Sequence, residues 1–438
     1  MKAVQRLPKP SSNQDWLARD REALASVLYR YTPIVVDHAQ GSYLYDVDGH
    51  RYLDFACGIA VTNLGHGHPA LRKAAHDQID RLFHTSVVAH HQPAIQLAER
   101  LAAAVPGKDN RVFFGNSGAE AVEGAIKLAR YVTGRPVIIG FQGAFHGRTY
   151  GALSLTSSKW YYRERYEPFL PGIYHVPYPY AYRNPTGPGD EATLSYVFDY
   201  IDEMLDTRVP PRNVAAFIVE PVLGEGGYVV PPAGFLPRLR ALCDRHQILL
   251  IADEVQCGYG RTGKMFACEH FGVVPDIMTV AKSIANGLPL SAVVADARLM
   301  DQWLPAAHGS TFGGNPVACA VGVATLDVLE REKVLENVEV RGRELMHRLQ
   351  ELQRRVPGIG DVRGLGLMIG VELVKPDGKP DHDLLDKVRK VSLDSGLILL
   401  SCGTHDNVLR LVPPLNLSAD ELEEAWEILQ GAFQEVAA

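Results

Sequence analysis

Residues 247–290 read QILLIADEVQCGYGRTGKMFACEHFGVVPDIMTVAKSIANGLPL. The stretch holds two short, largely apolar runs, residues 248–252 and 277–281, and a charged residue follows each, Asp253 and Lys282. Short apolar runs between turn residues are typical of strands buried in a parallel sheet. Because ligands of such sheets bind at the carboxyl ends of the strands, we expect Asp253 and Lys282 to converge on a binding site.

A carboxylate and a lysine that converge at a sheet edge are the pair that pyridoxal 5′-phosphate (PLP) requires. The lysine forms a Schiff base with the cofactor, and the acid keeps the pyridine nitrogen protonated so that the ring accepts electrons. A partly buried ion pair between Asp253 and Lys282 would explain the same two residues without any cofactor. The choice between these alternatives depends on the rest of the chain.

Length and composition narrow the class of protein. A chain of 438 residues is too long for one ordinary core, so we expect two or more domains. The net charge of −7 offers no basic field for nucleic acid. No apolar run reaches the roughly 18 residues of a membrane span, and the N-terminus lacks the apolar segment of a secretory signal. The six cysteines are scattered without a CxxC pair, which favours reduced thiols and a cytoplasmic protein.

Hydrophobic patterning predicts alternating strands and helices. Strands are expected at residues 111–114, 136–141, 214–220, 367–374, 397–401 and 408–412. Helices are expected at residues 70–105, 120–131, 233–246, from 316 beyond 332, and after 418. A hairpin is expected around Asp48-Gly49, and residues 159–190 are expected to be an irregular excursion. The composition shift after residue 330 predicts a smaller C-terminal α+β domain.

Three loops after predicted strands carry residues suited to an anionic, planar ligand. The small residues 115–119 precede a helix, so they predict either a phosphate site or a plain helix cap by Asn116 or Ser117. In the loop at 142–149, Phe145 suits stacking on a ring or core packing, and Arg148 suits a carboxylate or a surface ion pair. The glycine-rich turn at 223–227 carries Glu225 and is expected to be flexible.

Three other motifs resemble ligand-binding patterns but lack part of the pattern. GYGRTG at residues 258–263 matches GxGxxG, but a dinucleotide fingerprint opens a helix directly after a strand, and residues 254–257 intervene. The sequence DVDG at 46–49 predicts a turn and not a calcium loop, because no glutamate closes the ligand pattern. His66 and His68 have no third ligand candidate near them. We therefore expect neither a dinucleotide site nor a metal site.

Taken together, the segments resemble the class III aminotransferases, PLP enzymes of fold type I, over nearly the whole chain. The similarity to bacterial 4-aminobutyrate aminotransferases is the strongest within that class. The matching segments follow the family's order: DVDGHRYLDFACGIAVTNLGHGHP, FFGNSGAEAVEGAIKLAR, AFHGRT, VEPVLGEGG, LIADEVQCGYGRTGKMFA, TVAKSIANGLPL, GSTFGGNP, and GLILLSCG with NVLRLVPPL. Residues 83–91 depart from the pattern, because they lack an expected glutamine and contain His90 and His91.

The resemblance implies a role for each of several residues. Lys282 would hold the cofactor and move the proton, and Asp253 would pair with the pyridine nitrogen, with Glu220 beside the ring. The remaining cofactor-binding residues would be Ser117, Gly118, Ala119, Phe145, His146, Gln256 and, from the partner subunit, Thr311. Substrate carboxylates would meet Arg148 and Ile59 at the distal end and Arg410 at the α end, with Glu225 as a gate over Arg410.

The resemblance also implies an architecture and an activity. The fold would be α/β, with a mainly parallel central sheet in a large domain at residues 66–330 and a small α+β domain at 331–438, to which residues 1–65 contribute. The activity would transfer an amino group from an ω-amino acid, such as 4-aminobutyrate, to 2-oxoglutarate. A class III racemase or epimerase, or an ornithine, lysine or broad ω-amine transaminase, is the alternative. A homodimer, or a tetramer, with shared active sites is expected in the cytoplasm.

Overall fold

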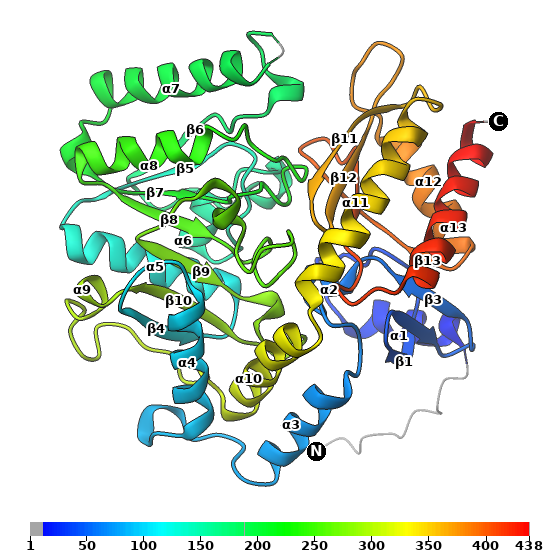
Figure 1. The fold of residues 1–438 in the computed structure, drawn as a ribbon, viewed down its shortest axis with the longest axis horizontal. Coiled ribbons are helices and arrows are strands. Elements are labelled where there is room, and N and C mark those ends of the chain that lie inside the picture. Colours follow the sequence, from blue (N-terminus) through cyan, green and yellow to red (C-terminus); the bar gives the residue numbers. More distant parts are fainter. Residues whose placement is uncertain (1–11, 188, 438) are drawn as a thin grey trace.

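A seven-stranded mixed sheet dominates the larger part of the molecule. The computed structural model describes residues 12–187 and 189–437. The strand order is β4-β10-β9-β8-β7-β5-β6 (Figure 1). The pairs from β9 through to β6 are parallel, whereas β10 runs antiparallel to both β9 and β4. The expected α/β architecture with a mainly parallel central sheet is therefore confirmed.

The strands of this sheet alternate with helices along the chain. The strands are β4 (Asn110–Gly115), β5 (Val137–Phe141), β6 (Ile173–Val176), β7 (Val214–Val219), β8 (Leu249–Asp253), β9 (Ile277–Val280) and β10 (Ser291–Asp296). The helices between them are α5 (Gly118–Thr133), α6 (Tyr150–Leu155), α7 (Asp190–Thr207) and α8 (Phe235–His246), with the short α9 (Ala297–Met300) after β10. All residues of β5, β7 and β9 are buried, as expected for strands covered on both faces.

Two smaller sheets lie beside the large one. The antiparallel sheet β11-β12-β15-β14 comprises β11 (Ile359–Leu365), β12 (Met368–Leu373), β15 (Val408–Leu411) and β14 (Leu400–Cys402). The other sheet comprises β1 (Val36–Gln40), β2 (Tyr43–Asp46), β3 (Arg51–Asp54) and β13 (Leu397–Ile398). Because β13 pairs with β3, the N-terminal strands share a sheet with the C-terminal part of the chain. The domain division at residues 65 and 330 stays a prediction.

The remaining helices flank these sheets (Figure 1). They are α1 (Asn13–Ala23), α2 (Cys57–Ala60), α3 (Pro69–Ile79), α4 (Gln92–Ala104), α10 (Pro316–Arg331), α11 (Val334–Gln353), α12 (His382–Asp394) and α13 (Ala419–Ala437). The expected hairpin forms between β2 and β3. Its Asp46 accepts hydrogen bonds from the backbone N–H groups of Asp48 (3.0 Å) and His50 (2.8 Å), so the carboxylate stabilises the turn.

Several expectations about local structure were wrong. The strand expected at 397–401 splits into β13 and β14, which belong to different sheets, and the helix expected from 316 beyond 332 ends at Arg331. Residues 70–105 form two helices, α3 and α4, because residues 80–91 interrupt them. Pro93 lies in the first turn of α4, and the Nδ1 atom of His91 accepts a hydrogen bond from the Ala94 N–H (3.3 Å), so these two residues start a new helix. The expected irregular excursion at 159–190 contains β6, which pairs along the edge of the large sheet with β5.

The GxGxxG segment at 258–263 forms turns and joins separate parts of the chain. Arg261 is fully buried, and its guanidinium donates hydrogen bonds to the carbonyl oxygens of Leu367 (3.1 Å) and Pro413 (2.6 Å). It also donates to the side-chain oxygen of Asn63. Buried donors are usually paired, and the acceptors here belong to separate segments. The Arg261 side chain therefore links the N-terminal segment and the small antiparallel sheet to the large domain.

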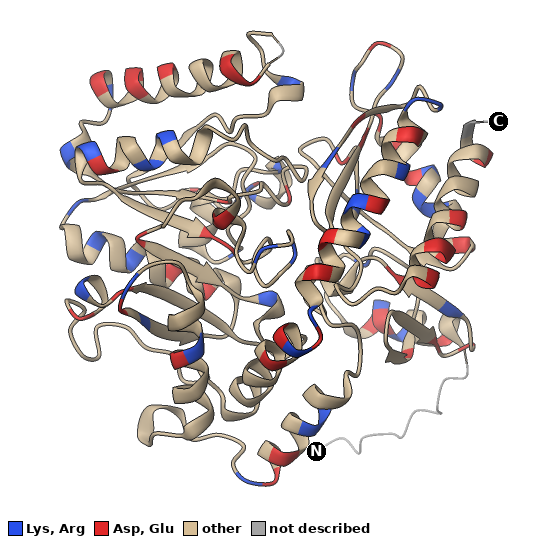
Figure 2. Cartoon of the chain, in the orientation of Figure 1, with Lys and Arg blue, Asp and Glu red and all other residues tan. Residues whose placement is uncertain are grey.

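The surface carries both signs of charge. Figure 2 shows lysine and arginine interspersed with aspartate and glutamate along α8 and α11. Within residues 12–187 and 189–437, none of the helices combines the length and the apolar character that crossing a membrane requires.

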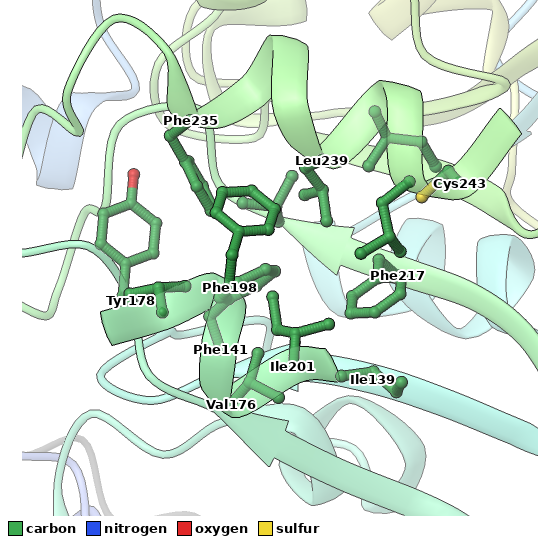
Figure 3. Close-up of a cluster of buried hydrophobic side chains, with 14 of the residues drawn as sticks. Ile139, Phe141, Val176, Tyr178, Phe198, Ile201, Phe217, Phe235, Leu239 and Cys243 are labelled. Atoms are coloured by element: carbon green, nitrogen blue, oxygen red, sulfur yellow. The ribbon is translucent and has the colours of Figure 1, made fainter. Parts of the chain in front are cut away.

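Aromatic side chains fill the core on one face of the large sheet. Phe235, the first residue of α8, is fully buried and meets the rings of Phe141, Tyr178 and Phe198 at centroid distances of 5.4, 5.7 and 6.1 Å (Figure 3). The first two contacts are edge-to-face, a favourable geometry for aromatic rings. The core therefore fixes α8 against the strands that lead to the carboxyl edge of the sheet.

Replacing Phe235 with alanine should leave a large cavity in this core. We expect the free energy of unfolding to fall by about 3–5 kcal/mol, which a lower melting temperature in calorimetry would report. Val340→Ala, which truncates an exposed side chain on α11, is the control and should shift stability by no more than about 0.5 kcal/mol. Equal melting temperatures for Phe235→Ala and Val340→Ala would contradict this account of the core.

Candidate active site

The carboxyl ends of three neighbouring strands converge on one cavity. Glu220 follows β7, Asp253 ends β8 and Lys282 follows β9, and these strands are adjacent and parallel. The cavity has a volume of about 410 Å³. Its lining residues are Tyr31, Gly58, Ile59, Val61, Gly118, Ala119, Phe145, His146, Gly147, Arg148, Tyr162, Glu220, Glu225, Asp253, Val255, Gln256, Lys282 and Arg410. All the site residues expected from the sequence line it, except Ser117 and Thr311.

Asp253 is buried and held by a network of hydrogen bonds. Its Oδ2 atom lies 2.6 Å from Nδ1 of His146, and its Oδ1 atom accepts a hydrogen bond from the Thr279 hydroxyl (2.9 Å). Burial opposes a charge on His146, but the hydrogen bond and charge of Asp253, together with Glu220, raise the pKa of His146. The hydrogen bonds therefore hold the Asp253 carboxyl group at the cavity wall in a fixed orientation.

Glu220 lies beside this pair. Its carboxylate accepts hydrogen bonds from the backbone N–H groups of Phe145 (2.9 Å) and Gly224 (2.9 Å). Burial, reinforced by the charge of Asp253 and opposed by His146, raises the pKa of Glu220 to about 7. Glu220 can therefore change its protonation state near neutral pH within the cavity.

Lys282 presents a buried amine whose pKa is lowered. Burial, followed by the positive charge of Arg410, lowers the pKa of Lys282 to about 8. No hydrogen bond or ion pair joins its Nζ atom to another of the described residues. The backbone of Lys282 adopts a φ of 47°, a left-handed conformation uncommon for a non-glycine residue and often found at functional sites.

The N-terminus of α5 offers backbone donors to an anion. Ser117 caps the helix, and its hydroxyl and its N–H group are both engaged with Glu120 in a capping box. The next two N–H groups, of Gly118 and Ala119, have no hydrogen-bond partner in the described part of the chain. A Cβ atom on Gly118 would lie 2.9 Å from Cγ1 of Val255, so only glycine allows this close approach. Ser117 therefore serves the cap, and the two unpaired N–H groups that follow it are suited to an anion.

Arg410 and Glu225 form a buried ion pair in the cavity wall. Nη1 of Arg410 lies 2.9 Å from Oε2 of Glu225, and the guanidinium is 1% exposed. The Nε and Nη2 atoms of Arg410 have no partner among the described residues. Burial would raise the pKa of Glu225, but the charges of Arg410 and Lys159 lower it, so Glu225 is ionised. Arg410 thus keeps unused donors for a ligand carboxylate.

The turn that carries Glu225 is not the flexible loop that its glycines suggested. Residues 220–229 are buried, and Leu223 and Val229 exchange two backbone hydrogen bonds (3.0 Å each). The Gly403 N–H donates to the Glu225 carbonyl (2.8 Å), and Arg363 donates to the Gly227 carbonyl (3.0 and 2.6 Å). Because the backbone is held at these points, movement of the Glu225 carboxylate falls to its side chain.

Aromatic rings surround the second arginine of the cavity. The Arg148 guanidinium is exposed and lies 4.4 Å from the centre of the Tyr162 ring. Phe145 meets the same tyrosine edge-to-face at 5.6 Å. Phe145 and the exposed Ile59 both line the cavity near this group. Arg148 donates no hydrogen bond to any residue in the described ranges, so its donors could receive a carboxylate that enters from solvent.

The sequence did not identify several residues of the site. Tyr31 lies outside the segments singled out in the sequence, yet it lines the cavity. Tyr162 and Lys159 lie in the expected irregular excursion at 159–190, yet Tyr162 lines the cavity and Lys159 contacts Glu225 (3.3 Å). Thr279 belongs to the apolar run at 277–281, which does not indicate its hydrogen bond to Asp253. For Tyr162 and Lys159, the one signal in the sequence is the richness of residues 159–190 in tyrosine. Thr311 is exposed, and His91 caps α4 away from the cavity.

Comparisons with known proteins agree with this geometry. The family model for aminotransferase class-III matches residues 25–433. The chain is 41% identical to the 5-aminovalerate aminotransferase DavT of Pseudomonas aeruginosa over 430 residues, covering 97% of this chain and 99% of that protein. It is 41% identical to the 4-aminobutyrate aminotransferase GabT of Escherichia coli over 431 residues, with the same coverage of 97% and 99%.

Two further similarities widen the range of related activities. An alanine/serine racemase of Pyrococcus horikoshii is 38% identical over 444 residues, covering 99% of this chain and 93% of that protein. The solved structure of an amine transaminase from an uncultivated Pseudomonas species, in a PLP-bound form, superposes with a TM-score of 0.88 at 32% identity. That comparison covers 99% of this chain and 100% of the other.

The fold and the site define a PLP-dependent transferase of fold type I. The chain belongs to the class III aminotransferase family, and it is a transaminase whose cofactor is PLP. The cavity residues fit this group: unpaired N–H groups of Gly118 and Ala119 suit its phosphate, and the carboxylate of Asp253 suits its pyridine nitrogen. The buried Oε1 atom of Gln256 has no partner among the described residues and suits the ring hydroxyl.

The lowered pKa of Lys282 predicts how PLP uptake by the apoenzyme depends on pH. Only the neutral amine attacks an aldehyde, and its fraction rises from about one tenth at pH 7 to about nine tenths at pH 9 when the pKa is about 8. We expect the rate of covalent attachment, followed by absorbance, to rise across this window and to level off above it. Lys282→Ala should show no covalent attachment. A rate that keeps rising through pH 10 would show that the pKa of Lys282 is not lowered.

Proposed function

We propose that this enzyme transfers an amino group from an ω-amino acid, such as 4-aminobutyrate or 5-aminovalerate, to 2-oxoglutarate, with an aldehyde and glutamate as products. The observation that carries the proposal is the pair of arginines, Arg148 and Arg410, in one cavity with Lys282. One arginine is open, and the other is covered by Glu225. Relatives named for 4-aminobutyrate and 5-aminovalerate support the choice of donor.

PLP in this cavity supplies a ring that withdraws electrons from the bond to be broken at the carbon bearing the amino group. Gly118 and Ala119 would receive its phosphate through their N–H groups, Phe145 would pack against its ring, and Gln256 would face its hydroxyl. Asp253, oriented by His146, would accept the hydrogen bond of the pyridine N–H and keep that proton in place. The neutral amine of Lys282 would accept the proton that the substrate carbon releases.

The two arginines would let one cavity accept two kinds of substrate in turn. Arg148 would hold the carboxylate that lies far from the reacting carbon, which both 4-aminobutyrate and glutamate possess. Glutamate has in addition an α-carboxylate, which Arg410 would bind through its unpaired Nε and Nη2 atoms. While an ω-amino acid is bound, Glu225 would neutralise Arg410, because an unpaired buried guanidinium is costly.

A homodimer would complete the site. The exposed apolar side chains of Phe83 and Phe312 belong to segments that lie side by side, since His84 packs on Phe312 (5.1 Å) and Asn315 donates to the Phe83 carbonyl (3.2 Å). Such a cluster beside the exposed Thr311 supports an interface there. Thr311 would then contribute to the phosphate site of the partner subunit, in a homodimer or tetramer located in the cytoplasm.

Racemisation of an amino acid is the second candidate, favoured by the 38% identity to the Pyrococcus racemase. It would use the same lysine and aspartate and would need an α-carboxylate at Arg410 in every turnover. A racemase would therefore have no need for Glu225 to exchange with a ligand.

A panel of amino donors tests the proposed function. With 2-oxoglutarate as acceptor, we expect glutamate to form from 4-aminobutyrate or 5-aminovalerate, measured by chromatography. The panel should include ornithine, lysine and a bulky amine, each with 2-oxoglutarate and with pyruvate. Inversion of L-alanine or L-serine without any keto acid, and without glutamate formation from ω-amino acids, would instead identify a racemase.

Truncation of the two arginines should affect the two half-reactions differently. Arg410→Ala should weaken 2-oxoglutarate binding by about 2–4 kcal/mol, because charged hydrogen bonds are lost, and should spare the half-reaction with the ω-amino acid. Arg148→Ala should impair both. Single-turnover kinetics of each half-reaction measures these effects separately. Equal losses in both halves for Arg410→Ala would favour a substrate that carries an α-carboxylate throughout.

A further inference from the structure

Lys159 lies behind the Arg410–Glu225 pair and is 4% exposed. Its Nζ atom lies 3.3 Å from Oε1 of Glu225, so the carboxylate sits between two cations. The hydroxyl of Tyr162 donates a hydrogen bond to the same Oε1 atom (3.1 Å). One oxygen of Glu225 therefore faces Arg410, and the other faces Lys159 and Tyr162.

Lys159 has a second acidic partner, Asp406, with which it forms a close ion pair. Asp406 lies in the loop between β14 and β15, close in sequence to Arg410. The same loop is tied to the Glu225 turn, because the Gly403 N–H donates to the Glu225 carbonyl (2.8 Å) and the Asp406 N–H donates to the Gly403 carbonyl (3.0 Å). Glu225 and Asp406 therefore both contact Lys159, and backbone hydrogen bonds hold the segments that carry them together.

We propose that Lys159 and Asp406 are positioning residues that set the balance between the covered and the uncovered state of Arg410. When Glu225 leaves Arg410, Lys159 receives its carboxylate, and Asp406 competes for the same ammonium group and limits this transfer. The proposal rests on the proposed exchange of an α-carboxylate with Glu225 at Arg410.

The cost of a buried charge explains the part of Lys159. Glu225 is 8% exposed, so a carboxylate that left Arg410 without another cation would be buried and unpaired. Lys159 is already at 3.3 Å and needs no backbone movement to receive it, which matches the anchored turn. With methionine in place of Lys159, Arg410 is the one cation left beside Glu225 among the described residues, so the covered state should be favoured.

Asp406 should act in the opposite direction. With asparagine in its place, Lys159 loses a competing charge and attracts Glu225 more strongly, so the uncovered state should be favoured. Asparagine also suits the backbone at this position, because Asp406 has a φ of 52° and asparagine is tolerated in the left-handed region. Lys159→Met and Asp406→Asn are thus expected to shift the equilibrium between the covered and uncovered states of Arg410 in opposite directions.

Ligand binding to the PLP-loaded enzyme tests this. Glutarate, which has two carboxylates and no reactive group, requires the uncovered state, whereas butyrate, with one carboxylate, does not. By calorimetry we expect Lys159→Met to weaken glutarate binding about tenfold or more and to leave butyrate binding unchanged. Asp406→Asn should strengthen glutarate binding. Lys379→Met, which removes an exposed lysine paired with Asp377 (2.9 Å), is the matched control and should change neither.

If Lys159→Met and Asp406→Asn both bind glutarate and butyrate more weakly, the two residues only maintain the structure. This result would overturn the proposal. If Lys159→Met does not fold, Asp406→Asn decides: tighter glutarate binding supports the proposal, and unchanged or weaker binding overturns it. Failure of the wild-type enzyme to use any ω-amino acid would refute the proposed function but leave the glutarate comparison valid. The two failures are therefore distinguishable.

Discussion

The parallel pairing of β7, β8 and β9 is the constraint on which the site depends. Parallel neighbours end at the same edge of a sheet, so the residues after these strands share one volume: Glu220, Asp253 and Lys282. No other part of the chain needs to bring them together. Burial of the strands on both faces then gives this edge a low dielectric constant, which lowers the pKa of Lys282 to about 8 and raises that of Glu220 to about 7.

Buried charge organises the opposite wall of the cavity. Arg410 comes from the small antiparallel sheet, and Glu225 comes from a turn after β7, so their ion pair joins two parts of the molecule. Lys159 and Asp406 extend the pair into a chain of alternating charges. Such a chain keeps each buried charge partnered while leaving donors of Arg410 available to a ligand. The Arg410–Glu225 pair therefore joins the small antiparallel sheet to the large domain and also leaves donors that could bind a substrate carboxylate.

The predictions for one helix, one strand and one turn were wrong because short-range sequence patterns did not reveal the contacts that form there. A single helix was expected at residues 70–105, but Pro93 and the cap by His91 start a second helix at Gln92. The strand β6 follows a segment rich in tyrosine and proline and pairs with the large sheet through only one neighbour, β5, so its sequence has little of a buried strand's pattern. The turn at 223–227 has the glycines of a flexible loop, yet hydrogen bonds from Arg363 and Gly403 hold its backbone.

The sequence by itself determined the sheet that carries the chemistry and most of the residues at its edge. Apolar runs ending in Asp253, Glu220 or just before Lys282 are local patterns, and parallel pairing makes their ends coincide. Only the tertiary structure decided the partners of those residues. The hydrogen bonds of Asp253 with His146 and Thr279, and the contacts of Lys159 with Glu225 and Asp406, join separate segments of the chain. Such contacts depend on packing between elements, which hydrophobic periodicity does not encode, and burial then sets the charge of each group.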